Sequence, residues 1–180
     1  MSAPDPRGFN SRETLRDGTA VTLRALRPDD RERMRAAFAR LSPTTLYLRT
    51  FSFRKELAES ELRRYVEVDF DRTVALVVTT GEGPGERVIG GGRYVRAEGA
   101  DTAEVAFTVD EDHRGLGIAS RLLTHLIAIA GQRGMRRFDA EVLAENGPML
   151  AVFARSGLPM KQRREGSVVH VELALTPSSG

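Results

Sequence analysis

The sequence predicts an α+β fold, a single domain built on one mixed, mostly antiparallel sheet that is flanked by helices. Its periodic segments follow the order strand, helices, three strands, helix, strand, helix, strand. Short polar turns join the three central strands, which makes these strands antiparallel neighbours. With 180 residues and 41% hydrophobic content, the chain can bury one sizeable core and is too short for two.

The first third of the chain is predicted to hold one strand and the helices that follow it. Residues 1–10 lack an apolar core and predict a flexible tail, whereas residues 16–28 predict a turn that leads into the strand. Residues 29–42 predict a helix, because acids in the first turn complement the helix dipole. Residues 42–53 predict a short helix and a loop, and apolar residues at helical spacing predict another helix over 56–68.

The predicted domain extends over residues 11–175. Its last two thirds contain the helix with the clearest apolar periodicity. This helix covers residues 117–134, carries an apolar stripe and ends at glycines. Residues 176–180 predict a flexible C-terminal tail. The remaining elements are strands at 73–80, 87–97, 103–110, 138–146 and 168–175, and a shorter helix at 148–158.

The composition excludes several classes of protein and site. Without cysteine, the chain has no disulfide, no thiolate metal ligand and no acyl-cysteine intermediate, and no residue cluster has metal-site spacing. No apolar run approaches the roughly 20 residues of a membrane span, so we expect no membrane partner. Acids and bases are interspersed and the formal net charge is +2, which argues against nucleic acid. No signal peptide is visible, and the cytoplasm is the expected compartment.

The strongest functional signal lies between the strand at 103–110 and the helix that follows it. Gly115 and Gly117 let a ligand approach the backbone, and the helix N-terminus offers unpaired amides and a positive dipole end. Arg114 adds a charged fork that suits phosphate. A plain strand-to-helix turn explains the same residues equally well. A Walker loop would need Gly-Lys-Ser/Thr, and a dinucleotide fingerprint would need glycine where Ser120 stands, so both are disfavoured.

This motif and the order of elements together resemble the GNAT superfamily of acyl-CoA-dependent N-acyltransferases. The resemblance covers nearly the whole chain and is strongest in AEVAFTVDEDHRGLGIASRLL and AEVLAENGPMLAVFARSGL. In that family, a Gln/Arg-x-x-Gly-x-Gly/Ala loop binds the CoA pyrophosphate. Asp112 replaces the leading Gln/Arg in this sequence, while Arg114, Gly115, Gly117 and Ala119 preserve the rest of the pattern.

The resemblance implies that acetyl-CoA is the co-substrate, that no metal is needed, and that the sheet splays apart between its fourth and fifth strands. An N–H near Val109 is the implied oxyanion donor. Phe153 stands where many relatives carry a tyrosine that protonates the leaving thiolate. Since Phe153 has no hydroxyl, we expect it to pack near the CoA thiol. Asn146 is expected to cap the helix that follows it, to contact the pantetheine, or both. The implied cofactor contacts are Phe107, Thr108, Val109, Arg114, Gly115, Leu116, Gly117, Ile118, Ala119, Ser120, Asn146 and Phe153.

Glu104 is the predicted general base. Strand alternation places it on one face with Ala106 and Thr108, which leave space for a substrate. A carboxylate in a partly dry cleft can accept the proton of a lysine ammonium, whose ordinary pKa is about 10.4. The resemblance points to the same position. An ordinary strand carboxylate is the alternative reading, Glu141 is the next candidate base, and a solvated acidic corner is expected at Asp110, Glu111 and Asp112.

More specifically, the segments RDGTAVTLRALRPDD, LSPTTLYLRTF, DFDRTVALVV and EVLAEN resemble the Pat-type bacterial protein lysine acetyltransferases. That resemblance implies direct transfer, within a ternary complex, to a lysine of an AMP-forming acyl-CoA synthetase such as acetyl-CoA synthetase, which is thereby inhibited. We expect a monomer or a weak homodimer. The alternatives are a small-molecule amine N-acetyltransferase, a non-catalytic acyl-CoA sensor and a plain nucleotide binder. The segment from Leu41 to Phe70 is expected to wall the acceptor side and to distinguish the two enzymes.

Overall fold

The computed structural model describes residues 4–41 and 59–175. It begins with the 3-10 turn η1 (Pro6–Gly8), the hairpin of β1 (Asn10–Thr14) and β2 (Ala20–Ala25), and the turn η2 (Pro28–Asp30), which leads into α1 (Arg31–Ala39). Helix α3 (Glu59–Val66) follows, in agreement with the helix predicted over 56–68 as far as that helix is described. The helix and loop predicted at 42–53 lie outside the described residues.

The strand predicted over 138–146 ends at Leu143, and the helix predicted over 148–158 ends at Ala154. The other predicted elements from residue 73 onward agree within one or two residues, and the structure contains one additional strand. That strand is β7. Near the N-terminus, β1 is a second strand that was not predicted. The predicted flexible tail over residues 1–10 instead contains η1, in which Pro6 is buried, and the start of β1. The elements are β3 (Thr73–Thr80), η3 (Gly83–Gly85), β4 (Arg87–Arg96), β5 (Thr102–Val109), η4 (Glu111–His113), α4 (Ile118–Gln132), β6 (Arg137–Leu143), α5 (Gly147–Ala154), β7 (Met160–Glu165) and β8 (Val168–Ala174).

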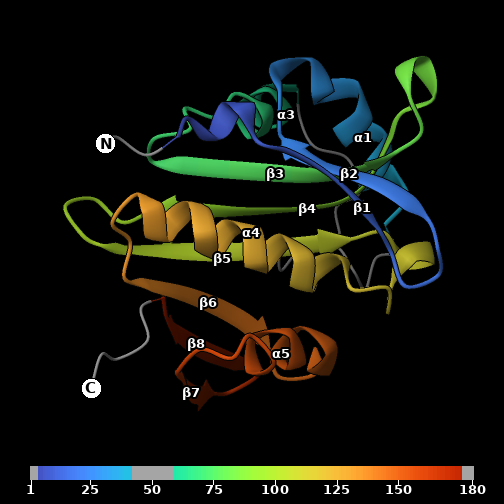
Figure 1. The fold of residues 1–180 in the computed structure, drawn as a ribbon. Helices are drawn as coiled ribbons and strands as arrows, with labels where there is room; N and C mark the ends of the chain where they lie inside the picture. The colour runs from blue at the N-terminus through green and yellow to red at the C-terminus, as the bar shows by residue number, and fades with distance from the viewer. Residues whose placement is uncertain (1–3, 42–58, 176–180) are drawn as a thin grey trace.

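The strands form one sheet in the order β1-β2-β3-β4-β5-β6-β8-β7, so β1 and β7 are its outer strands (Figure 1). The pair β5–β6 is parallel and every other pair is antiparallel. This arrangement confirms the predicted α+β fold with a mixed, mostly antiparallel sheet. No helix in the described part of the chain is long and apolar enough to cross a bilayer.

The helices cover both faces of the sheet, and β3 shows how the sequence serves the two faces. Val74, Leu76 and Val78 belong to the main apolar core, which includes α4, whereas Ala75 and Val77 pack in a second cluster with α1 and α3. This alternation is the period of two that a strand buried on both sides requires. Figure 1 shows α4 running along β4 and β5 on the first face, called here the α4 face; the opposite face is called the α1 face.

Three consecutive glycines in β4 serve these two faces differently. A Cβ on Gly90 would lie 2.8 Å from Cγ2 of Ile118, and a Cβ on Gly92 would lie 2.7 Å from Cδ1 of Phe107. Both glycines therefore allow the α4 face to close onto the sheet. Gly91 lies on the α1 face, where a Cβ would meet the Leu76 carbonyl oxygen at 3.3 Å.

A buried ionic network attaches α1 to the sheet. The guanidinium of Arg24 (5% exposed) contacts both carboxylate oxygens of Asp30 (0% exposed) at 2.8 and 2.6 Å, and it contacts Glu86 at 3.0 Å. Burial raises the pKa of Asp30, but the hydrogen bonds from Arg24 and from the amide of Arg27, together with their charges, bring this pKa below its ordinary value. The network therefore keeps Asp30 ionised next to Arg24.

The β1–β2 hairpin is bound to the first half of α4. Arg121 donates to the carboxylate of Glu13 at 2.7 Å and to the carbonyl of Thr14 at 2.8 Å, and the ring of His125 lies 2.7 Å from the second oxygen of Glu13. Burial raises the pKa of Glu13, but the hydrogen bonds from Arg121, His125 and Ser11 more than offset it, so the pKa of Glu13 is lowered. The hairpin is thereby positioned next to the N-terminus of α4.

Candidate active site

The sheet splays apart between β5 and β6. These are the fourth and fifth of the predicted strands, because β1 was not predicted. The two strands pair at three positions, the last of which is Glu104 with Asp139. Beyond this point β5 continues to Val109 and stays paired with β4, while β6 diverges from it. The predicted splay is therefore confirmed, and one edge of β5 lies open after Glu104.

The direction of the backbone groups along this open edge follows from the β4–β5 ladder. The amide of Asp110 donates to the carbonyl of Ile89, and that of Ala97 donates to the carbonyl of Thr102. In an antiparallel pair, every second residue bonds the partner strand, so the even-numbered residues of β5 face β4 and the odd-numbered ones face β6. The N–H and C=O groups of Phe107 and Val109 therefore point into the splay. Those of Thr108 belong to the ladder with β4, which corrects the prediction that its backbone binds the cofactor arm.

A cleft with about 350 Å³ of empty space fills the splay. It is lined by Phe107 of β5, Glu141 of β6, and Asn146 and Phe153 at the two ends of α5. Phe153 is 1% exposed and its ring centre lies 6.0 Å from that of Phe107, as expected of a packing residue. Asn146 caps α5, because its side-chain oxygen accepts from the amide of Met149 at 3.3 Å. An open strand edge beside a cleft fits an extended, amide-containing arm such as pantetheine.

The glycine motif forms the turn that leads into α4, at the end of β5 where the splay is open. Gly115 (φ +76°) and Gly117 (φ +92°) both adopt left-handed backbone conformations, which favour glycine. Gly117 is the N-cap of α4 and makes no side-chain cap, so the first amides of the helix are not covered by a capping oxygen. The first turn of α4 contains Ile118, which is buried, and Ala119 and Ser120, which are partly exposed. Arg114 and Leu116 flank Gly115 on the same turn. This geometry suits a diphosphate.

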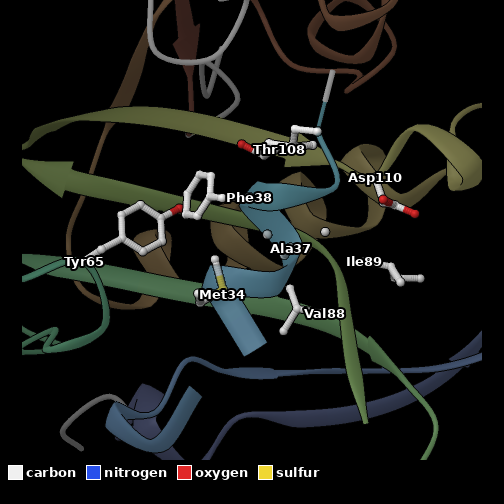
Figure 2. Close-up of a pocket in the computed structure, with 11 residues that line it drawn as sticks. Met34, Ala37, Phe38, Tyr65, Val88, Ile89, Thr108 and Asp110 are labelled. Atoms are coloured by element: carbon white, nitrogen blue, oxygen red, sulfur yellow. The ribbon is translucent and has the colours of Figure 1, made fainter. Parts of the chain in front are cut away.

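A second pocket, with about 340 Å³ of empty space, lies on the α1 face (Figure 2). Met34 and Phe38 of α1 and Tyr65 of α3 form its apolar wall, and the rings of Phe38 and Tyr65 meet edge to face at 5.4 Å. Gly91 and Thr108, which are opposite each other in the β4–β5 ladder, form its floor. The hydroxyl of Thr108 is buried and has no partner among the described residues. We call this cavity the α1-face pocket.

Asp110 does not belong to a solvated acidic corner, which corrects the prediction for this residue. It is 6% exposed, its carboxylate lies 2.9 Å from Nδ1 of His113 and 3.6 Å from Nε of Arg40, and it lines the α1-face pocket. Glu111 and Asp112 are exposed, as predicted. The amide of Asp110 still pairs with β4, and Arg40 from the distant α1 segment helps to cover the carboxylate.

The two candidate bases lie on the same face of the sheet at different distances from the cavities. Glu104 is exposed at the point where the splay begins, and it shares the α1 face with Ala106 and Thr108, as predicted. Its side chain lines neither cavity. Glu141 lines the cleft and lies 3.6 Å from Nδ1 of His170. The described residues contain no group of three or more His, Cys, Asp or Glu side chains that could hold a metal.

The comparisons with known proteins agree on one family. Residues 38–158 match the acetyltransferase (GNAT) family. The chain is 34% identical over 137 residues to "Acetyltransferase PA5475" of Pseudomonas aeruginosa, covering 76% of this chain and 74% of that protein. It is also 38% identical over 165 residues to "Acetyltransferase Pat" of Mycolicibacterium smegmatis, covering 91% of this chain and 48% of that protein. The chain therefore spans about half the length of this second relative.

The solved structures give the same result. The GNAT domain of S. lividans PAT superposes with a TM-score of 0.82 at 35% sequence identity, and the match covers 92% of this chain and 96% of that domain. The fold and the sequence motif therefore identify the same family.

Proposed function

Because this chain belongs to the GNAT family of acetyltransferases, we propose that it moves an acetyl group from acetyl-CoA to a lysine side chain of another protein. The proposed acceptor is an AMP-forming acyl-CoA synthetase such as acetyl-CoA synthetase, which acetylation inhibits. The protein acceptor is supported by the Pat-type segments of the sequence and by the 38% identity to the M. smegmatis acetyltransferase Pat. The proposed site of action is the cytoplasm.

The observation that carries this proposal is the open edge of β5 beside the cleft. The backbone groups of Phe107 and Val109 would hold the pantetheine arm as an added strand, and the turn at Gly115 and Gly117 would bind the diphosphate. The amide of Val109 is the proposed donor to the acyl carbonyl oxygen. When bound, acetyl-CoA supplies an acyl group activated as a thioester.

Glu104 is the proposed general base for the acceptor amine. One of its carboxylate oxygens would take the amine proton, directly or through a water molecule, on the face of the sheet that it shares with the α1-face pocket. Glu141 is the competing candidate, because it lines the cleft itself. The two glutamates lie on neighbouring strands, so substitution of each one separately distinguishes them.

Phe153 lies at the position where many relatives carry a tyrosine, and it has no hydroxyl that could protonate the leaving thiolate. A thiol has an ordinary pKa of about 8.5, so its thiolate can leave without an acid or take a proton from water. The proposed role of Phe153 is to exclude water from the inner end of the cleft, together with Phe107.

The α1-face pocket favours a second candidate function, the acetylation of a small-molecule amine. It is largely apolar and includes the hydroxyl of Thr108, which has no partner within residues 4–41 and 59–175, and such a pocket suits a small ligand. The segment from Leu41 to Phe70 is expected to wall the acceptor side and so to distinguish a protein acceptor from a small amine. Residues 42–58 of this segment lie outside the described part of the chain. The acceptor itself must therefore be tested.

The decisive experiment incubates the protein with labelled acetyl-CoA and purified acyl-CoA synthetases, and then locates the label by mass spectrometry. We expect one lysine of a synthetase to carry the acetyl group and the activity of that synthetase to fall. A panel of free amines is included as competing acceptors. Labelling of free amines alone would establish the small-molecule function instead, and the absence of any labelled product would contradict both functions.

Three matched variants test the base. We expect Glu104→Gln to lower kcat about 100-fold to 1,000-fold, because a positioned general base contributes on that order, and to leave CoA affinity within about twofold. Glu98→Gln removes an exposed carboxylate from the β4–β5 turn and serves as the control. If Glu141→Gln shows the large loss and Glu104→Gln does not, Glu141 is the base. A non-catalytic sensor would keep its output in all three variants.

A further inference from the structure

The tip of the β1–β2 hairpin lies against the glycine turn. Nη1 of Arg16 donates to the carbonyl oxygen of Gly115 at 3.4 Å, although the two residues are 99 positions apart in the sequence. A Cβ on Gly117 would lie 3.7 Å from Nε and 3.9 Å from Nη2 of Arg16. The guanidinium is therefore next to both glycines of the motif, and it comes from a segment that the motif does not include.

The fold holds Arg16 in this position from both sides. Leu15, the preceding residue, is 3% exposed in the main core, and its amide donates to the carbonyl of Thr19 at 2.9 Å. The carboxylate of Asp17, the following residue, accepts from the amide of Thr19 at 3.0 Å. The contacts of Arg121 with Glu13 and Thr14 bind the whole hairpin to α4. The backbone at Arg16 is therefore fixed beside this turn before a ligand binds.

The charges around the turn explain why a cation there would matter. Asp112 replaces the Gln/Arg that begins the motif, and Glu111 beside it is also exposed. The carboxylate of Asp112 opposes the approach of a phosphate. Across residues 4–41 and 59–175, no carboxylate forms an ion pair with Arg16, whose polar contact is the neutral carbonyl of Gly115. The side chain is exposed, so an incoming anion can reach it.

We propose that Arg16 binds the diphosphate of CoA and supplies the cationic contact that Asp112 cannot make. This inference rests on the CoA site proposed above, and it adds a binding residue from the β1–β2 hairpin to that site. A guanidinium presents paired N–H donors in a planar fork that matches phosphate oxygens. The hairpin then contributes to cofactor affinity as well as to the edge of the sheet.

The test is calorimetric titration of the protein with CoA, 3′-dephospho-CoA and pantetheine. We expect Arg16→Gln to weaken the binding of CoA and of dephospho-CoA by about tenfold each, the order of a charge-assisted hydrogen bond at an exposed site. Pantetheine has no phosphate, so its affinity should not change. Arg12→Gln removes an exposed arginine from the same hairpin and is the matched control, and it should bind all three ligands as the parent does.

Three results would overturn the inference. The first is unchanged CoA affinity in Arg16→Gln, and the second is a loss that appears with CoA but not with dephospho-CoA, which would assign Arg16 to the 3′-phosphate. The third is an equal loss in Arg12→Gln, which would show a general charge effect. Arg16→Lys keeps the charge and should lose less than Arg16→Gln, and thermal melting verifies that each variant is folded. If the parent protein itself does not bind CoA, the CoA site fails and this inference fails with it.

Discussion

On the α4 face of the sheet, apolar side chains from both ends of the chain form one continuous core, and Gly90 and Gly92 allow it to close onto β4. On the α1 face, the apolar cluster is smaller, and the buried network of Arg24, Asp30 and Glu86 attaches α1 to the sheet. The α1-face pocket remains open between α1, α3 and β4.

The two faces of the sheet therefore suit two different tasks, the proposed binding of the cofactor and the proposed binding of the acceptor. The turn at the N-terminus of α4, proposed above to bind the cofactor, leads into a helix with tight apolar packing, which resists small displacements. The face proposed for the acceptor depends on charges and keeps empty space, so its stability responds to pH and its shape can be altered without repacking the core.

The largest effect is expected at the buried network. Asp30→Asn keeps the size of the side chain but leaves the guanidinium of Arg24 buried with Glu86 as its remaining anionic partner. Removal of one partner from a buried ion pair is strongly destabilising, so we expect the free energy of unfolding to fall by about 3 kcal/mol. Urea denaturation measures this change. A loss below about 1 kcal/mol would show that the α1 face does not depend on the network.

The same network predicts a loss of stability in acid. Because the pKa of Asp30 is lowered in the folded protein, its contribution is present above the unfolded pKa of about 3.9 and is lost as the pH falls through the folded value. The stability difference between the parent and Asp30→Asn should therefore be largest near neutral pH and shrink below about pH 4. Denaturation curves at a series of pH values measure it, and a difference that stays constant would contradict the assignment.

Two neighbouring glycines provide an internal comparison of the faces. In Gly92→Ala the new methyl group would lie 2.7 Å from the ring of Phe107, which has little room to move, and we expect a loss of about 1 to 3 kcal/mol. In Gly91→Ala the nearest atom is the Leu76 carbonyl oxygen at 3.3 Å, and the loss should stay below about 1 kcal/mol. Urea denaturation of the two variants measures both, and equal losses would show that the faces are packed alike.

The smallest effect is expected at the surface of the α1 face. Arg35 of α1 contacts both Glu32 and Glu59, and the contact with Glu59 joins α1 to α3. Both of these carboxylates are exposed, so Glu59→Gln should change the free energy of unfolding by less than about 0.5 kcal/mol. A loss as large as that of Asp30→Asn would mean that exposed charges, and not the buried network, hold this face.

The sequence predicted the fold well wherever an element buries an apolar face. Helix α4 and strands β3 to β5 agree with their predicted ranges within one or two residues, since their apolar periodicity is strong. The two additional strands have none. Apart from Met160, the residues of Asn10–Thr14 and Met160–Glu165 are polar or charged. Both segments are at most partly buried, so they become strands through pairing with β2 and β8. Tertiary pairing of this kind leaves no local signal.

The candidate site divides in the same way. The glycine turn and the cap at Asn146 could be predicted because each depends on a local motif, and the splay could be predicted because the sequence resembles the GNAT family. The burial of Asp110 and the position of Arg16 could not, because each depends on contacts between distant segments. The parity of the β4–β5 ladder alone shows that the backbone of Thr108 faces β4.

The two outer strands of the sheet, β1 and β7, each have one edge that pairs with no other strand of the described sheet. Strand β7 presents Lys161, Arg163 and Arg164 on an exposed border, and β1 at the other border is short and hydrophilic. Unpaired strand borders are templates on which a second chain can add, and cationic side chains or short length discourage such addition. The charge of β7 and the short length of β1 therefore disfavour the addition of a strand from another molecule at either edge of the sheet.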